Sequence, residues 1–171
     1  MGDEVHEECG VGAVFLKEDS ENSTIVPLTL DLILSDIQRR GQSGTGIAIH
    51  RMKEREYFKP FLHRKKPADV NTFFGGDDSQ KRGWVLNTYR GIAGIGHVRY
   101  TTSGEDDSDG LQPFYRRHGK RSKRFCFCFN GNQPNYSELE SELCAQDYEL
   151  EIGTDTEVIM HLIAPHGSYT P

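Results

Sequence analysis

The stretch HEECGVGAVFL, residues 6–16, places a thiol directly before an apolar run. The residues from Gly10 onward predict a buried strand, and Cys9 stands immediately in front of it. Only eight mostly acidic or polar residues, Met1 to Glu8, precede that cysteine. If this leader were removed, Cys9 would carry a thiol and a free α-amine on the same carbon.

The free amine matters because such a group ordinarily has a pKa of about 7.7–8.0. It can therefore act near neutral pH as the general base for its own thiol, as in N-terminal nucleophile catalysis, without a neighbouring histidine. While the leader is attached, the same nitrogen belongs to an amide and cannot accept a proton. The alternative interpretation of Cys9 is a buried structural cysteine.

Composition excludes several classes of protein. A chain of 171 residues corresponds to one domain or one domain cut short, and its net charge of −6 at pH 7 argues against nucleic-acid binding. No apolar run approaches the roughly 18 residues that a membrane span needs, and the acidic N-terminus is no signal peptide. The four cysteines show no disulfide or zinc framework, so we expect no metal site and a reducing, cytoplasmic location.

Hydrophobic patterns predict strands and helices without strict βαβ alternation. Strands are expected at 10–16, 47–50, 56–62, 92–100 and 125–129, with 56–62 as the hairpin partner of 47–50. Helices are expected from Pro27 at the first helical position toward Arg40, at 136–145 and at 155–163. Residues 63–83 are predicted to form a polar loop with a short helix. This order favours a mainly antiparallel α+β layer structure.

The stretch GHVRYTTSG, residues 96–104, has two interpretations. It is a strand end running into a turn, or it is a clamp for a small carboxylate. Arg99 can bind a carboxylate through two hydrogen bonds, and Thr101, Thr102 or Ser103 can add a hydroxyl donor. His97 is expected to be structural.

Three further stretches allow both a structural and a chemical interpretation. Asn130-Gly131 in FNGNQPN is typical of a turn, but a side-chain amide and a glycine N–H at a strand end can also form an oxyanion hole. In GTDTEVI, Thr154 or Asp155 can cap a helix, and a carboxylate there can instead bind an ammonium group. The CFC stretch at 126–128 is expected to pack rather than to bind metal, because no second cysteine pair exists.

The motifs are more specific as an ordered set. ECGVGAVF, RRGQSGTGIA, GIGHVRYTTSG, LQPF, NGN and TDTEVI follow one another from about Cys9 to Leu162. This set resembles the glutaminase domain of class II (N-terminal nucleophile) glutamine amidotransferases, and most of all those of the amidophosphoribosyltransferases, which are glycosyltransferases of purine biosynthesis. The resemblance implies an Ntn-hydrolase-like four-layer αββα sandwich of two antiparallel sheets.

The resemblance also implies a role for each candidate residue, with L-glutamine as substrate and no cofactor. Cys9 would attack the glutamine amide to form a thioester and release ammonia, and Met1 to Glu8 would be a self-removed propeptide. The other roles are an oxyanion hole (Asn130, Gly131), a carboxylate clamp (Arg99, with Thr102 nearby), an ammonium-binding carboxylate (Asp155) and an Arg-Gly pair beside the nucleophile (Arg40, Gly41).

The sequence departs from the family pattern at three positions. Arg39 and Phe129 stand where the family usually has histidine, and Gly110 stands where it often has asparagine. None of these departures removes a predicted catalytic group. Arg39 and Phe129 change residues that surround the site, so a slower reaction is expected.

Residues 9–171 are expected to form the glutaminase domain, incomplete at its C-terminal end, because the family domain continues with further strands after the TDTEVI helix. A phosphoribosyltransferase domain is not present in these residues, so a synthase subunit or domain would be supplied in trans. An incomplete C-terminal end is compatible with a fragment, with a degenerate copy and with a subunit that a partner completes. Two other functions stay open: a non-catalytic glutamine-binding or regulatory module, and a glutaminase subunit of another synthase such as glutamate synthase.

Overall fold

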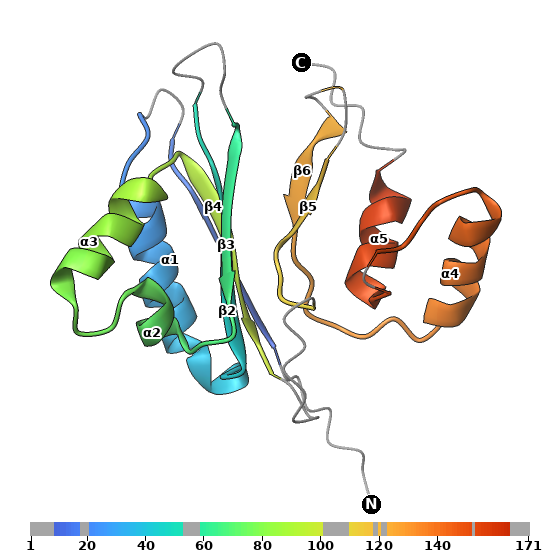
Figure 1. The fold of residues 1–171 in the computed structure, drawn as a ribbon, viewed down its shortest axis with the longest axis horizontal. Helices are drawn as coiled ribbons and strands as arrows, with labels where there is room; N and C mark the ends of the chain where they lie inside the picture. The colour runs from blue at the N-terminus through green and yellow to red at the C-terminus, as the bar shows by residue number, and fades with distance from the viewer. Residues whose placement is uncertain are drawn as a thin grey trace, which may run out of the picture.

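The computed structural model describes residues 9–17, 21–52, 59–100, 110–117, 120, 123–151 and 153–164. These residues form four layers, with helices outside and two antiparallel sheets inside (Figure 1). This arrangement confirms the αββα sandwich that the sequence resemblance implied. Among the helices of these ranges, none is both long enough and apolar enough to cross a membrane.

The first sheet holds four antiparallel strands in the order β1-β4-β2-β3. Its strands are β1 (Gly10–Phe15), β2 (Gly44–His50), β3 (Phe61–Lys66) and β4 (Ala93–Arg99). Gly10 pairs with Val98, and Gly44 pairs with Arg99. The register therefore places the start of β1, the start of β2 and the end of β4 at the same end of the sheet.

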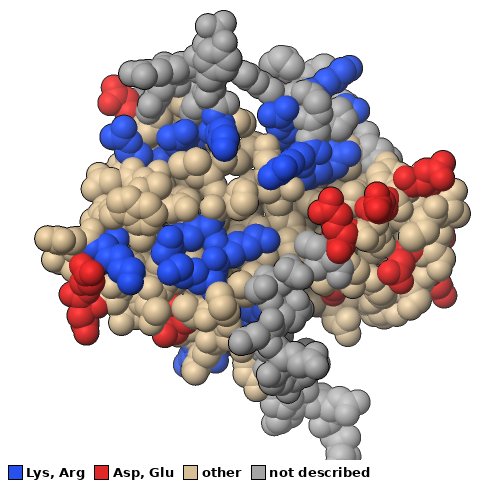
Figure 2. Space-filling view, viewed as in Figure 1, with Lys and Arg blue, Asp and Glu red and all other residues tan. Residues whose placement is uncertain are grey.

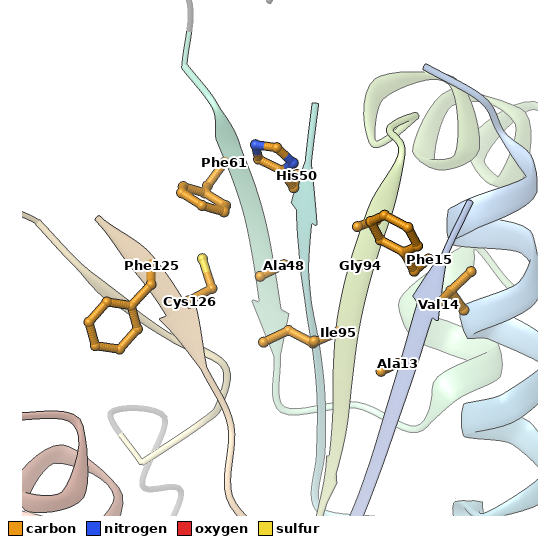
Figure 3. Close-up of a pocket in the computed structure, with 11 residues that line it drawn as sticks. Ala13, Val14, Phe15, Ala48, His50, Phe61, Gly94, Ile95, Phe125 and Cys126 are labelled. Atoms are coloured by element: carbon orange, nitrogen blue, oxygen red, sulfur yellow. The ribbon is translucent and has the colours of Figure 1, made fainter. Parts of the chain in front are cut away.

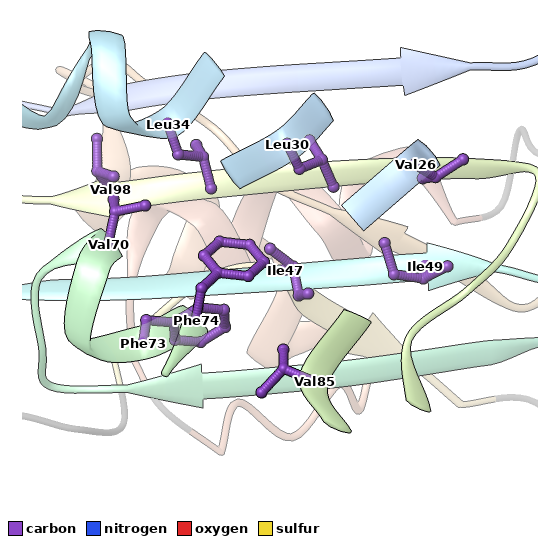
Figure 4. Packing of buried hydrophobic residues seen from close by; sticks show 10 residues of the cluster. All are labelled: Val26, Leu30, Leu34, Ile47, Ile49, Val70, Phe73, Phe74, Val85 and Val98. Carbon is purple, nitrogen blue, oxygen red and sulfur yellow. The ribbon is translucent and has the colours of Figure 1, made fainter. Parts of the chain in front are cut away.

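One face of the first sheet is covered by α1 (Ile25–Asp36), α2 (Val70–Phe74) and α3 (Ser79–Thr88) (Figure 1). The buried side chains on this side form one cluster, shown in Figure 4, in which each residue is at most 1% exposed. A Cβ atom added to Gly96 would lie 2.7 Å from Cδ1 of Leu34. Gly96 of β4 thus lets α1 approach the sheet closely.

The opposite face of the first sheet packs against the second sheet, which holds β5 (Phe114–Arg116) and β6 (Phe125–Phe127). Tyr115 of β5 contacts the rings of Phe61 and His63 on β3, with ring centroids 5.9 Å and 5.8 Å away. The outer layer is α4 (Tyr136–Ala145) and α5 (Asp155–Ile163), which lie beyond the second sheet (Figure 1).

Several predicted elements need correction. Helix α1 begins at Ile25, so Pro27 is its third residue, where the missing N–H also costs no intrahelical bond. Strand β3 does pair with β2, but it extends to Lys66, into the predicted loop. The remainder of that loop holds α2 and the first half of α3, and the side chains of Asp69 and Asp78 cap these two helices. Strand β5 was not predicted.

Candidate functional site

Cys9 lies directly before β1 and is half-buried. Its carbonyl oxygen accepts a hydrogen bond of 3.0 Å from Nε of Arg40. Arg40 ends a short 3-10 helix, Gln38–Arg40, that follows α1. The structure therefore brings the predicted nucleophile and the arginine of the Arg-Gly pair into contact, although 31 residues separate them.

The other cysteines have different surroundings. Burial raises the pKa of the Cys126 and Cys128 thiols to about 12. Both thiols are therefore protonated at neutral pH and are poor nucleophiles, in agreement with a packing role. Cys144 is exposed on α4.

Gly41 fits against the end of β4, where Arg99 is the last residue. A Cβ atom at Gly41 would lie 2.6 Å from the carbonyl carbon of Arg99, so this contact requires a glycine. The segment is held by Gln38, whose Nε2 donates to the Gly41 oxygen at 2.6 Å and whose Oε1 accepts from the Val70 N–H at 2.5 Å. The Ser43 N–H donates to the Arg99 oxygen at 2.9 Å.

The guanidinium of Arg99 lies against Gly110. A Cβ atom at Gly110 would be 2.8 Å from Cζ of Arg99, so any larger residue would require the guanidinium to move. Gly110, where the family often has asparagine, therefore lies against the guanidinium of the predicted carboxylate clamp.

The segment after Gly110 packs on β2. A Cβ atom at Gly46 would lie 3.0 Å from the carbonyl carbon of Gln112, so this glycine permits the close approach. The Gln112 side chain is buried, with Oε1 accepting from the Phe129 N–H at 2.6 Å and Nε2 donating to Oγ1 of Thr156 at 3.0 Å. Gln112 therefore connects the segment after β6 with the first turn of α5.

His97 is buried in β4, two residues before Arg99. Burial, together with the charges of Arg99 and Lys65, lowers the pKa of His97 to about 4, and a backbone hydrogen bond with Phe129 acts in the opposite direction. His97 is thus neutral at neutral pH, as expected for a structural histidine. Its Nε2 atom is buried and has no hydrogen-bond partner among the described residues.

Asn130 and Gly131 follow β6 and are exposed. The ring of Phe129 lies over Gly131, because a Cβ atom on this glycine would meet the ring Cζ at 2.5 Å. The residue that replaces the family's histidine therefore packs on one member of the predicted oxyanion hole.

Asp155 is the first residue of α5 and is half-buried. Thr154 is the N-cap, and its Oγ1 accepts from the Glu157 N–H at 3.3 Å. Asp155 Oδ1 accepts from the Thr156 N–H at 2.7 Å. Of the two capping residues that the sequence allowed, Thr154 fills the role, and the Asp155 carboxylate stands at the helix N-terminus, where negative charge is favoured.

Seven of the eight predicted site residues are described, and a continuous series of contacts joins most of them. It runs from Cys9 through Arg40 and Gly41 to Arg99, and from there through the 110–112 segment to Phe129, Gly131 and Asp155. Figure 1 shows the start of β1, the end of β4, the segment after β6 and the start of α5 at the same end of the molecule. Thr102 and the leader Met1 to Glu8 lie outside the described residues.

Gln112 is the site neighbour that the sequence interpretation missed. It belongs to the quoted LQPF motif, but no role was assigned to it. A glutamine between a leucine and a proline in an apolar stretch was the available signal, because a buried amide must find hydrogen-bond partners.

An apolar pocket of about 440 Å³ lies at the opposite end of the first sheet (Figure 3). Cys126 points into it from β6, and its other walls come from the late part of β1, the early part of β4 and the His50–Phe61 pair. Among the described residues that line this pocket, none carries a carboxylate, a side-chain amide, an amine or a guanidinium, and burial lowers the pKa of His50. These lining residues offer no partner for the charged groups of a small zwitterion.

A second cavity, of about 610 Å³, lies between β3, β5 and α5. Its lining is mixed in charge, with basic Lys65 and Arg116 facing acidic Glu149 and Glu151. Figure 2 shows the same division on a larger scale, with basic side chains over the first sheet and acidic ones over the α4–α5 layer. In the described ranges, no cluster of three or more His, Cys, Asp or Glu residues can hold a metal ion.

Comparisons with known proteins agree with this geometry. A family model described as a glutamine amidotransferase domain matches residues 76–170. Amidophosphoribosyltransferase from Bacillus subtilis is 29% identical over 97% of this chain and 31% of its own length, and that from mouse is 31% identical over 98% and 29%. The Staphylococcus aureus enzyme is 33% identical over 93% of this chain and 28% of its own length.

A solved structure, described as the allosteric regulatory enzyme of purine biosynthesis, superposes with a TM-score of 0.72 at 27% identity. The superposition covers 94% of this chain and 30% of that chain. The present chain thus spans about a third of the length of these relatives.

Proposed function

We propose that this chain, which belongs to the glutamine amidotransferase domain family, hydrolyses the side-chain amide of L-glutamine through the thiol of Cys9. The observation that carries the proposal is the contact series that brings Cys9, Arg40, Gly41 and Arg99 to one end of the first sheet. The segments that carry the oxyanion-hole candidates and Asp155 lie at that end as well.

Glutamine is a small zwitterion with a terminal amide, and each of its groups has a candidate partner. The Arg99 guanidinium suits the α-carboxylate, because an arginine fork can make two parallel hydrogen bonds to it. Asp155 suits the α-ammonium group. We assign Thr102 a hydroxyl contact near the α-carboxylate, as the resemblance implies.

The reaction begins once the leader has been removed and Cys9 has a free α-amine. The amine takes the thiol proton while Sγ attacks the amide carbon, and the resulting oxyanion is stabilised by the Asn130 side chain and the Gly131 N–H. Collapse breaks the C–N bond, and the proton on the amine passes to the leaving nitrogen, which departs as ammonia. A thioester of Cys9 remains.

Water then attacks the thioester, and the amine accepts a proton from it. Collapse of the second tetrahedral intermediate breaks the C–S bond, releases glutamate and returns the proton to the thiol. Arg40 holds the carbonyl group of Cys9 throughout the reaction. The amine and the thiol are attached elsewhere on the same residue and stay free to react.

The test is ammonia release from glutamine by the matured chain and by its Cys9→Ala variant. We expect the variant to lose activity by several orders of magnitude, because no other group can form the thioester. Cys144→Ala removes an exposed thiol on α4 and is the matched control, which should keep full activity. Equal rates for Cys9→Ala and the parent chain would reject the mechanism.

We propose further that the ammonia serves a synthase domain or subunit. The relatives named above are amidophosphoribosyltransferases about three times as long as the matched region, which supports an acceptor reaction of purine biosynthesis. The test is ammonia transfer when the chain is mixed with a phosphoribosyltransferase domain and phosphoribosyl pyrophosphate. Binding of the chain to a different synthase, such as glutamate synthase, would instead identify that synthase as the acceptor of the ammonia.

A second candidate function is a glutamine-binding module without turnover. The observation that favours it is the Phe129 ring, which packs against Gly131, one member of the predicted oxyanion hole, where the family usually has a histidine. Calorimetry that detects glutamine binding without ammonia release would support this function. Sustained ammonia release would exclude it.

A further inference from the structure

We infer that Gln112 is a positioning residue, whose buried amide sets the oxyanion-hole segment relative to the carboxylate of Asp155. The inference rests on the proposed glutamine hydrolysis for its functional consequence, and on contacts between described residues for its structural part. Gln112 itself contacts neither the nucleophile nor the substrate-binding side chains in the described contacts, so its effect is exerted through Phe129 and Thr156.

The first step is the position of the amide. Gln112 is 9% exposed and lies between the first sheet and the second sheet, with its backbone packed against Gly46 of β2. A side chain in this place can reach both the segment after β6 and the start of α5.

The second step is the chemistry of the two hydrogen bonds. Oε1 accepts from the Phe129 N–H at 2.6 Å, and Nε2 donates to the Thr156 hydroxyl at 3.0 Å. Among neutral side chains of this length, a primary amide can accept at one atom and donate at the other. Breaking either bond would leave a buried polar group unsatisfied, which costs about 1–3 kcal/mol.

The third step is what lies beyond each partner. Phe129 directly precedes Asn130 and Gly131 in the chain. The buried Gln112 side chain thus holds the residue that leads into the predicted oxyanion hole. Electrostatic stabilisation of an oxyanion depends on donors that are already in place, so this restraint bears directly on rate.

On the other side, Thr156 contacts the predicted ammonium-binding residue. The Thr156 N–H donates to Oδ1 of Asp155 at 2.7 Å, and the Thr156 hydroxyl lies 3.3 Å from the same oxygen. The hydroxyl is therefore shared between Gln112 and Asp155. Through this hydroxyl, the Gln112 side chain fixes two positions relative to each other. One would bind the reacting amide of glutamine, and the other its α-ammonium group.

The experiment compares three variants of the matured chain with the parent. Gln112→Met keeps the length of the side chain and removes both of its hydrogen bonds. Thr156→Val keeps the shape and removes the hydroxyl that contacts Gln112 and Asp155, and the third variant combines the two. Gln80→Met is the matched control, because Gln80 is exposed on α3 in the opposite outer layer. Thr156→Ser restores the hydroxyl and should rescue most of the loss.

We expect Gln112→Met to lower kcat for glutamine hydrolysis by about 10- to 100-fold, somewhat less than the loss of an oxyanion-hole donor itself. The loss in the double variant should be smaller than the product of the two single losses, because both substitutions break the Gln112–Thr156 hydrogen bond. A folded Gln112→Met variant with unchanged kcat would overturn the inference, and so would effects that simply multiply.

A second readout does not depend on activity. Amide hydrogen exchange of the Phe129 N–H should accelerate at least about 10-fold in Gln112→Met, and not in Gln80→Met, because its buried acceptor is gone. If the parent chain released no ammonia, the proposed function would fail, yet the exchange rates would still decide the positioning role. Unchanged exchange at Phe129 in a folded Gln112→Met variant would refute it.

Discussion

The two faces of the first sheet differ in what they pack against. On the helix side, apolar residues of α1, α2 and α3 fill one continuous cluster with the strands, and its members are almost fully buried (Figure 4). On the side of the second sheet, the same strands meet a buried glutamine, a buried histidine and several close glycine contacts. One face therefore supplies stability, and the other supplies polar groups whose positions are set by hydrogen bonds.

This difference bears on how the fold positions the candidate site. Hydrophobic burial is not directional, so it can support the sheet without determining the position of any single polar group. Hydrogen bonds are directional, and a buried one that is lost leaves a penalty behind. Substitutions on the helix side should therefore change stability, whereas those on the other face should change both local geometry and pH response.

The largest effect is expected on the helix side, from Leu30→Ala. Leu30 is 0% exposed and packs between α1 and β4, so the variant should lose about 2–5 kcal/mol of unfolding free energy. Leu32→Ala is the matched control on the same helix, because Leu32 is 59% exposed and its loss should cost less than about 0.5 kcal/mol. Denaturant unfolding measures both, and similar losses would contradict the division between the faces.

The next effect concerns His97 on the other face. Its pKa is about 4 in the folded chain and 6.5 in an ordinary environment, so the unfolded chain binds the extra proton between these values. Stability contributed by the neutral imidazole is therefore present above pH 6.5 and is lost as pH falls toward 4.

The test for this residue is His97→Gln, which cannot titrate. We expect the parent chain to lose about 2–3 kcal/mol more than the variant between pH 7 and pH 4.5. The other histidines and the carboxylates contribute equally to both proteins. Parallel stability curves for parent and variant would show that His97 is not the group that titrates.

A smaller effect is expected from Gly41→Ala. A Cβ atom there would lie 2.6–2.8 Å from backbone atoms of Val98 and Arg99, so we expect a loss of about 1–3 kcal/mol and a displaced Arg99. Gly83→Ala is the control, because no atom lies within 4 Å of a Cβ atom at that position in α3. Alanine at 83 should stabilise the chain by about 0.5–1 kcal/mol. If thermal unfolding showed both variants to be more stable than the parent, or both less stable, the close contact of Gly41 with β4 would be refuted.

The smallest effect is expected from Thr154→Ala, which removes the N-cap of α5. The loss should be about 1 kcal/mol, and Thr154→Ser should restore most of it because serine keeps the hydroxyl. Since Asp155 is the next residue, affinity for glutamate should fall in the alanine variant alone. Calorimetric titration with glutamate measures this affinity. Equal affinities in both variants would show that the Thr154 cap does not affect the candidate site.

The predicted elements succeeded where local signals were strong. Helices α4 and α5 have the predicted bounds, and the side chain of Thr154 caps α5. The predicted strand ended at Leu62, before the end of β3, because the last four residues of β3, HRKK, are polar and mostly charged, as in many edge strands, and show no clear alternation. Strand β5 holds only three residues, too few for a periodic pattern.

The residues of the candidate site also differ in how well the sequence predicted them. Cys9, Arg40, Gly41 and Arg99 belong to recognisable motifs, and the structure places them together. Gln112 was not recognised because its partners Phe129 and Thr156 are 17 and 44 residues away in the sequence. Only the packing of the second layer onto β2 brings these three residues together, and no local pattern encodes that packing.

The most direct measurement is the intact mass of the purified chain before and after reaction with a glutamine-analogue electrophile. We expect the mass to show loss of Met1 to Glu8 and then the addition of one label, which peptide mapping should locate on Cys9. A chain that keeps its leader and leaves Cys9 unlabelled would contradict the N-terminal nucleophile mechanism and favour the binding module.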